Sequence, residues 1–273
     1  MKKMISPVVL LFIALLPLIS FASSVYYPTD FKKQIAKHEI VDQELKDDIF
    51  VILTSSHTRL PTGDDVLGCN QRVGTCFSHQ AVGYSNARKY LYTQLHVQTD
   101  SRGKFLKEVY CNHEQIVPIN ENTINCEHTW PQSKFTSAFD NETQKSDLHH
   151  LFPSDSKANS IRGNMNFTDV SFDNGSLDSN CSASKFGSSA VKSNDGFEPP
   201  LTHKGNVARA LFYFSVRYKI TIPKTEEDVL RRWNDLDPVD QEEMHNNDLI
   251  EQVQKNRNPF VDFPSLANDI TKF

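Results

Sequence analysis

The middle of the chain carries the pattern that most restricts its fold. From Gly103 onward, Lys107–Cys111 and Ile116–Ile119 are short runs of β-type residues, and they lead into a third run, Ile124–His128. Such runs are too short to be long amphipathic helices and are separated by polar and Gly or Pro residues. The sequence therefore predicts a strand-rich centre.

A helix is predicted soon after these strands. Pro153-Ser154-Asp155 is typical of a helix start, with Ser154 placed to cap a short helix that runs through Asn159 and ends near Gly163. Asn159 and Arg162 are three positions apart on this helix, so their side chains should face the same way.

Helical periodicity surrounds this centre. Two N-terminal helices are expected, the first starting near Asp30 behind a Thr29 cap, and further helices are expected at Asn86 to Leu95, Asn206 to Tyr218, Glu226 to Trp233 behind a Thr225 cap, and Gln241 to Lys255. Residues 63–77 and 171–205 are rich in turn-forming residues and are predicted as a loop and a long surface excursion. The overall expectation is an α+β protein that is mainly helical, with one domain spanning residues 23–273.

The first 22 residues resemble a secretory signal peptide. Lys2 and Lys3 precede an apolar run from Val8 to Phe21, and small residues at Ser20 and Ala22 suit cleavage after Ala22. A membrane anchor fits less well, because Pro17 interrupts the run and the run is shorter than the roughly 18 residues that a span needs. We therefore expect a secreted or periplasmic protein of a Gram-negative bacterium, with no membrane association after cleavage.

The five cysteines agree with export. They contain no Cys-x-x-Cys pair, which argues against zinc ribbons and thioredoxin chemistry and favours disulfides. Cys69 and Cys76 flank a short loop that they could close. Cys111, Cys126 and Cys181 leave one thiol over, and the sequence does not fix their pairing.

Net charge gives weak guidance about partners. The formal charge is −5, and loss of Lys2 and Lys3 with the signal would make it two units more negative. A protein with this balance can bind a polyanion only by gathering Lys and Arg on one face. Nothing in the sequence indicates oligomer formation, so we expect a monomer.

Two segments carry residues suited to catalysis. In Glu127-His128-Thr129-Trp130-Pro131 a carboxylate adjoins an imidazole at the end of a predicted strand, and because neighbouring strand residues point to opposite faces, the pair can share a site only if the strand ends or bends there. The second segment is Asp147-Leu148-His149-His150-Leu151, which precedes Asn159, Arg162 and Asn164. Each segment alone also fits an ordinary packed structure.

Taken together, the segments resemble the bacterial endonuclease I family, a branch of the His-Asn-His or ββα-metal nucleases. The resemblance lies in Glu127-His128, in Asp147-Leu148-His149 with Pro153, and in Asn159-Ser160-Ile161-Arg162-Gly163-Asn164. It continues through Pro199-Pro200, the segment Ala208 to Phe214, Trp233-Asn234 and Asn256-Arg257-Asn258-Pro259-Phe260, and so covers most of residues 84–263.

The resemblance implies a V-shaped fold with a two-strand-plus-helix unit at a central cleft. It implies that Glu127 and Asn159 hold one divalent cation, Mg²⁺ or alternatively Mn²⁺ or Ca²⁺, which suits oxygen donors. His128 would be the general base that activates water, and Arg162 would share in catalysis by meeting a phosphate. The substrate would be DNA, and RNA as well, cut without sequence preference to 5′-phosphate and 3′-hydroxyl ends.

Details of the site remain open at this stage. Family members carry an arginine between the two segments, whereas Thr129 to Ser146 contains only Lys134 and Lys145, so these lysines or Arg162 would bind the phosphate. Asp147 is expected to orient other groups. Of His149 and His150, which a strand would direct to opposite faces, one should support the metal ligands and the other be partly exposed. Asp155 is an alternative carboxylate ligand, although a helix start also explains it.

Two other functions compete with a nuclease. The chain could bind nucleic acid or a surface partner without cutting, although binding alone does not require an acid, a base and an amide together. It could also be a zinc hydrolase that uses His149, His150 and a cysteine, but it lacks the His-Glu-x-x-His pattern of a metalloprotease.

Overall fold

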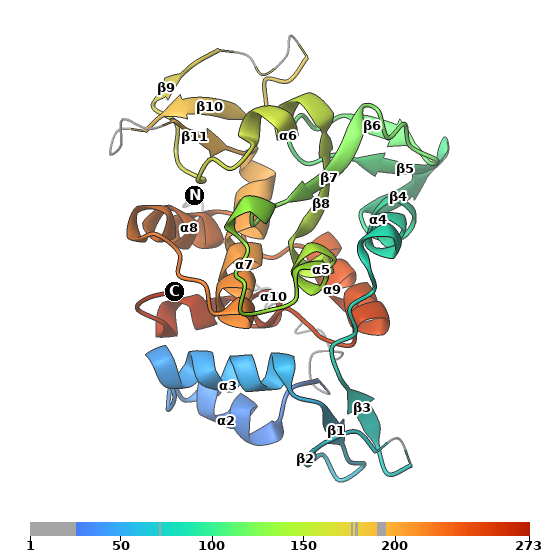
Figure 1. Cartoon of the computed structure of the whole chain (residues 1–273), viewed down its shortest axis with the longest axis vertical. Helices are drawn as coiled ribbons and strands as arrows, with labels where there is room; N and C mark the ends of the chain where they lie inside the picture. The colour runs from blue at the N-terminus through green and yellow to red at the C-terminus, as the bar shows by residue number, and fades with distance from the viewer. Residues whose placement is uncertain (1–25, 71, 176, 178–179, 190–194) are drawn as a thin grey trace, which may run out of the picture.

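The computed structural model describes residues 26–70, 72–175, 177, 180–189 and 195–273. Helix accounts for 44% and strand for 18% of the chain, which confirms the α+β class (Figure 1). The proposed signal peptide lies outside the described residues. Among those described, no helix is both long and apolar enough to cross a membrane.

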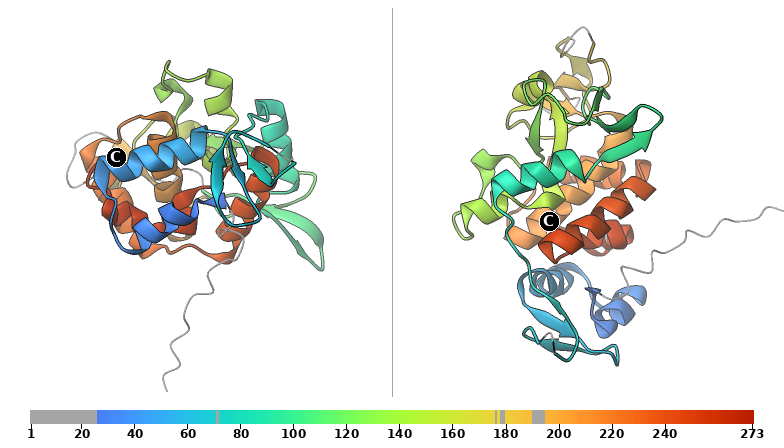
Figure 2. Two further views of the ribbon diagram at one scale, coloured as in Figure 1. Left: turned by 90° about the horizontal axis from the view of Figure 1, so that it is seen from below. Right: turned by 90° about the vertical axis from the view of Figure 1, so that its right-hand side faces the viewer.

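An N-terminal layer lies at one end of the molecule (Figure 2, right). It contains the two expected helices, α2 (Thr29–Ala36) and α3 (Asp42–Thr54), and a three-stranded antiparallel sheet in the order β2 (Asp65–Leu67), β1 (His57–Arg59), β3 (Thr75–Phe77). The sheet corrects the expected loop. Thr29 is the first helical residue and not the cap, and its hydroxyl donates to the carbonyl of Gly63.

A second antiparallel sheet follows helix α4 (Tyr84–Thr93). Its strands are β4 (Val97–Asp100), β5 (Gly103–Lys107) and β6 (Glu114–Ile116), so the expected strands were displaced by a few residues. The segment between β5 and β6 docks on the next hairpin, where the Val109 amide donates to the carbonyl of Pro153.

The central hairpin consists of β7 (Ile124–His128) and β8 (Leu151–Asp155), and it is followed directly by helix α6 (Ser156–Arg162). Three short helices connect the strands: η1 (Gln132–Lys134), α5 (Asn141–Lys145) and η2 (Leu148–His150). The expected strand and helix are confirmed, but Pro153 and Ser154 belong to β8. The α6 cap is Asp155, whose carboxylate accepts from the amides of Lys157 and Ala158.

The surface excursion includes a small sheet with the order β11 (Asp195–Glu198), β10 (Lys185–Ser188), β9 (Phe172–Asp173). A disulfide between Cys111 and Cys181 ties this excursion to the β5–β6 loop, and a second joins Cys69 to Cys76 as expected. Cys126 is the remaining thiol and is buried.

Helix α7 (Leu201–Tyr218) runs through the centre of the molecule (Figure 1), and Phe212, Tyr213 and Phe214 are completely buried in it. Around it lie α8 (Lys224–Leu236), α9 (Gln241–Gln254), α10 (Pro259–Asp262) and η3 (Pro264–Asp269). The expected Thr225 cap is wrong, since Pro223 precedes the first turn of α8. Two apolar clusters form the core: one surrounds α7, and the other joins α4 to one face of the β7–β8 hairpin.

Candidate nuclease site on the hairpin and helix α6

The two faces of strand β7 have different neighbours. Ile124 and Cys126 pack in the cluster that includes Ala87 and Leu91 of α4. Glu127, with the opposite orientation, faces α6, because its Oε1 lies 2.9 Å from Nη1 of Arg162. The alternation of side chains along a strand thus puts carboxylate and helix together.

Glu127 is almost fully buried and has one oxygen without a hydrogen bond. Its Oε1 accepts from the Tyr110 hydroxyl at 2.7 Å and also meets Arg162. No described group donates to its Oε2. Burial raises the pKa of Glu127, while Arg162 and Tyr110 oppose that rise. Arg162 and Tyr110 thus both hold Oε1 and leave Oε2 open to a ligand.

Asn159 completes this face of the hairpin. Its Nδ2 donates to Oδ1 of Asn125 at 2.6 Å and to the carbonyl of Cys126 at 3.4 Å. These bonds fix the orientation of the amide, and its Oδ1 receives no hydrogen bond from any described residue. The hairpin and α6 thus present two free oxygens, one from a carboxylate and one from an amide, which is the donor set that a hard divalent cation prefers.

The ring of His128 is held in one tautomer at the end of β7. Its Nε2 lies 3.1 Å from the Lys145 carbonyl, which can only accept, so Nε2 carries the proton. Nδ1 therefore has a lone pair, and the Gln132 amide donates to it at 3.3 Å. Burial, followed by the nearby His150, lowers the pKa of His128 to about 3. The ring is neutral near pH 7 and can accept a proton at Nδ1.

The segment between β7 and β8 carries two lysines: Lys145 has no ion-pair partner among the described residues, whereas Lys134 is attracted by the carboxylate of Glu226. Lys145 places Nζ 4.4 Å from the centre of the Tyr84 ring, which itself lies 5.4 Å from the His128 ring. Lys134 donates to the neutral Oδ1 of Asn166 at 2.7 Å. Lys145 is therefore the cation beside His128 that is available to an anion.

Arg162 does not face a phosphate, contrary to expectation. Its guanidinium is 2% exposed, is paired with Glu127, and donates to the carbonyls of His128 and Thr129. Burial of this cation is compensated by that carboxylate and those carbonyls. Arg162 therefore positions Glu127 and the end of β7.

The segment around Asp147 lies behind the site and is fully buried. Asp147 accepts hydrogen bonds from Tyr213, Tyr218 and Gln254, which fits its expected orienting role. His149 and His150 lie in a 3₁₀ helix, and both are buried, with their rings packed against Tyr213 and Phe214 of α7, so the expectation of one exposed histidine on a strand is wrong.

No cluster of His149, His150 and a cysteine exists among the described residues. His149 and His150 bond to the carbonyls of Asn256 and Gln144, respectively. Within that part of the chain, one group of potential ligand atoms lies close together, that of Glu108, Cys111 and His113. Cys111 is in a disulfide, and Glu108 already accepts four backbone amides, so this group does not fit a metal site.

Three residues of the site were not predicted. Asn125 precedes Glu127 by two positions, so strand alternation alone could have indicated it. Gln132 and Tyr110 come from a 3₁₀ turn and from a distant loop, and their contacts depend on tertiary packing.

Comparison with known proteins agrees with this geometry. Residues 74–265 match the family model described as Endonuclease I, which is more than half of the chain. The chain belongs to the endonuclease I family. The match begins just before β3 and ends in η3, so it contains every candidate residue and leaves out α2, α3, β1 and β2.

Several curated nucleases are similar to this endonuclease I family member. The extracellular ribonuclease of Bacillus subtilis is 35% identical over 186 residues, 59% of this chain and 60% of the relative. That of Bacillus amyloliquefaciens is 37% identical over 166 residues, 54% of this chain and 53% of the relative. An extracellular deoxyribonuclease of Aeromonas hydrophila is 27% identical over 120 residues, 42% and 48% of the two chains. The likeness thus covers about half of each relative.

Proposed function

We propose that this protein is a secreted or periplasmic endonuclease. It would hydrolyse phosphodiester bonds with the help of a divalent cation, for which Mg²⁺ is the first candidate. The observation that carries this proposal is the pairing of two free oxygens, Glu127 Oε2 and Asn159 Oδ1, with a histidine whose proton is fixed on the far nitrogen. A site for binding alone needs no such combination. The names of the relatives, which include ribonucleases and a deoxyribonuclease, support both RNA and DNA as substrates.

Glu127 and Asn159 would hold the cation, with Arg162 and Tyr110 fixing the carboxylate from behind. When bound, the ion would stabilise negative charge on the phosphate and on the departing 3′ oxygen. His128 would take a proton from the attacking water at Nδ1 and leave 5′-phosphate and 3′-hydroxyl ends. A phosphate nearby would raise the pKa of the ring toward the range useful for a base.

Lys145 is the candidate for the missing arginine. Its carbonyl fixes the tautomer of His128, and its ammonium lies on the ring of Tyr84 beside that histidine. As a point charge it can attract a phosphate without the two-pronged geometry of a guanidinium. Contact with backbone phosphate needs no base recognition, which agrees with cleavage that is not sequence-specific.

The deciding experiment is digestion of plasmid DNA and of RNA by protein starting at Ser23, with Mg²⁺ or with chelator. The His128→Ala variant should lose roughly 10²- to 10⁴-fold in rate, the usual contribution of a general base. Equal activity of both proteins would point to a contaminant. No cleavage by wild type, with nucleic-acid binding retained by both proteins, would replace the proposal with a non-cutting module.

A further inference from the structure

Tyr84, the first residue of helix α4, lies in the site without a role in the proposed function. Its side chain is half-buried, and its ring centre lies 5.4 Å from that of His128. The Lys145 ammonium lies 4.4 Å from the centre of the same ring. One aromatic ring therefore contacts both the proposed base and the cation that would attract a phosphate.

The backbone of Tyr84 is fixed separately from its ring. Oε1 of Glu142 accepts the Tyr84 amide at 2.5 Å, and Glu142 belongs to α5, whose last residue is Lys145. Helix α5 is itself capped by Asp140, whose carboxylate accepts the Thr143 amide. The start of α4 is thus attached to α5 by a bond that does not depend on the Tyr84 side chain.

Lys145 keeps its positive charge because no carboxylate is paired with it among the described residues. Glu142, three positions earlier in α5, could form such a pair but bonds to the Tyr84 amide. A lysine has a long flexible side chain, and fixing it costs rotamer freedom. An aromatic ring attracts an ammonium without cancelling its charge. Tyr84 can therefore orient Lys145 and leave it available to an anion.

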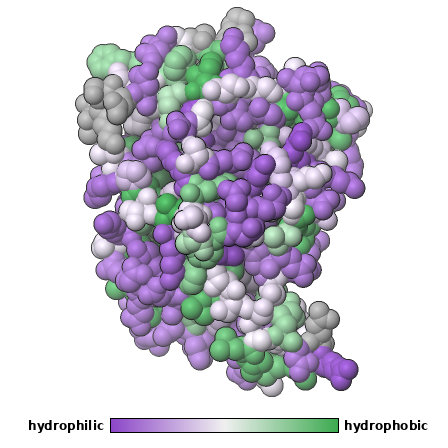
Figure 3. Space-filling model, in the orientation of Figure 1, coloured by the Kyte–Doolittle hydropathy of each residue, from purple (hydrophilic) through white to green (hydrophobic). Residues whose placement is uncertain are grey.

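The surroundings of α5 leave Lys145 open to solvent on one side. Its side chain is partly exposed, and Figure 3 shows predominantly hydrophilic residues over the middle of the molecule, where α5 lies in the same view (Figure 1). Arg88 also lies near the Tyr84 ring, at 6.0 Å, but it is paired with Glu121. Lys145 is thus the cation at this ring whose charge is not already matched by a carboxylate.

We propose that Tyr84 is a positioning residue, which holds the Lys145 ammonium beside His128 where the phosphate to be cut would bind. The ring acts through Lys145 and need not touch the substrate. Its hydroxyl is not needed for this attraction, because a phenylalanine ring also attracts a cation. This inference rests on the proposed function, since it assumes that the anion beside His128 is a nucleic-acid phosphate.

The test is a double-mutant cycle, measured as kcat/KM for cleavage of a fluorogenic oligonucleotide with Mg²⁺. Tyr84→Leu removes the ring and should lower kcat/KM about three- to thirtyfold, the range that corresponds to a cation–π interaction. In the Lys145→Met background the same change should have an effect of less than about twofold, because no ammonium remains to be positioned. Tyr84→Phe should stay within about twofold of wild type.

A second set of variants preserves the shape of the ring, in case Tyr84→Leu does not fold. Tyr84 is replaced by phenylalanine rings that carry one, two or three fluorine atoms, which withdraw electron density from the ring face and weaken its attraction for a cation. The value of kcat/KM should fall with each added fluorine in the Lys145 protein and stay constant in the Lys145→Met background.

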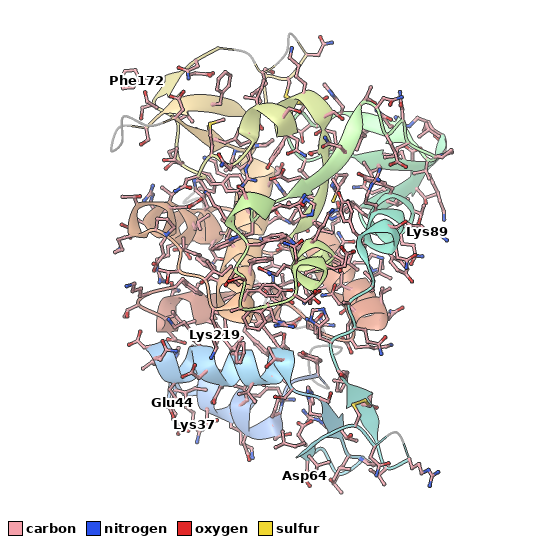
Figure 4. All side chains as sticks on the ribbon, in the orientation of Figure 1. Lys37, Glu44, Asp64, Lys89, Phe172 and Lys219 are labelled. Atoms are coloured by element: carbon pink, nitrogen blue, oxygen red, sulfur yellow. A yellow bond between two sulfur atoms is a disulfide. The ribbon has the colours of Figure 1, made fainter. Side chains whose placement is uncertain are left out.

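Lys89→Met is a matched control for the loss of a lysine. Lys89 is exposed on the side of α4 away from the hairpin (Figure 4), so this change should leave kcat/KM unaltered. Equal losses from Tyr84→Leu in both backgrounds would mean that the ring only packs the site and would overturn the inference. A Tyr84→Phe variant as slow as Tyr84→Leu, or no effect of fluorine, would overturn it as well. Absence of metal-dependent cleavage by wild type would instead reject the proposed function.

Discussion

The loop from Glu108 to His113 and the strand from Ile124 to His128 each bury one glutamate near the central hairpin, but the fold satisfies these carboxylates differently. Both oxygens of Glu108 accept backbone amides, from Tyr110, Cys111, His113 and Asp155. Glu127 accepts at Oε1 alone among the described residues and keeps Oε2 open. A saturated buried carboxylate organises a loop, whereas one with a spare oxygen and a compensating arginine can serve a ligand.

The largest expected effect on activity distinguishes Glu127 from Glu108. Glu127→Gln should reduce kcat/KM by roughly 10²- to 10³-fold, since it removes charge at the reacting centre. Loss of the partner of buried Arg162 should also cost about 3–5 kcal/mol in the free energy of unfolding. Glu108→Gln should destabilise the protein as well, because a Gln amide group would face backbone donors, yet the folded fraction should retain activity. Initial rates and urea unfolding would measure both effects.

Stabilisation of the folded protein by the bound cation provides a control for the comparison of Glu127 with Glu108. A ligand at one hundred times its Kd adds about 2.7 kcal/mol to the free energy of unfolding. Mg²⁺ titrations followed by thermal unfolding should show this gain in wild type and Glu108→Gln and its loss in Glu127→Gln. The opposite pattern would assign the cation to the Glu108 loop.

The pH dependence of stability tests three buried histidines away from the proposed cation ligands. Burial lowers the pKa of His203 to about 3 and, together with smaller effects, those of His149 and His150 to about 4. Because the unfolded chain binds protons near pH 6.5 and the folded protein does not, stability is present above that pH. It should fall between pH 6.5 and about 4 by up to about 1.4 kcal/mol per pH unit for each histidine.

His203 offers a matched variant for this prediction. It is remote in sequence from the candidate ligands, and its ring packs against Phe152 at 4.7 Å, so phenylalanine can replace it with similar volume. Urea unfolding at several pH values should give His203→Phe a slope smaller by one proton. An unchanged slope would mean that His203 does not titrate as its burial indicates.

The sequence could predict features of this comparison that depend on neighbouring residues, but not those that depend on contacts between distant parts of the chain. The three-residue spacing predicted that Asn159 and Arg162 face the same way, because this depends only on local helix geometry. That Glu127 and Asn159 share a site was implied only by the family resemblance. Two other features depend on how the loop from Glu108 to His113 packs on the hairpin. These are the four amides that bond to Glu108 and the hydrogen bond from the Tyr110 hydroxyl to Glu127. The orientation of Arg162 could not be predicted, because the same side chain can reach outward to a phosphate or inward to a buried acid. The segment 148–150 was misassigned because a 3₁₀ turn and a strand differ little in so short a stretch.

The smallest effect concerns Asp155, the remaining carboxylate beside the hairpin. Its oxygen Oδ1 accepts the amides of Lys157 and Ala158, so it caps α6, and the cation would have to compete with this role. Asp155→Ala should therefore cost about 1 kcal/mol in the free energy of unfolding and change kcat/KM only a few-fold, whereas Asp155→Asn should preserve the cap and most of the stability. If instead both variants stayed folded but lost activity a hundredfold together with stabilisation by Mg²⁺, Asp155 would be a ligand. The distinction between saturated and open carboxylates would then fail at the residue closest to the site.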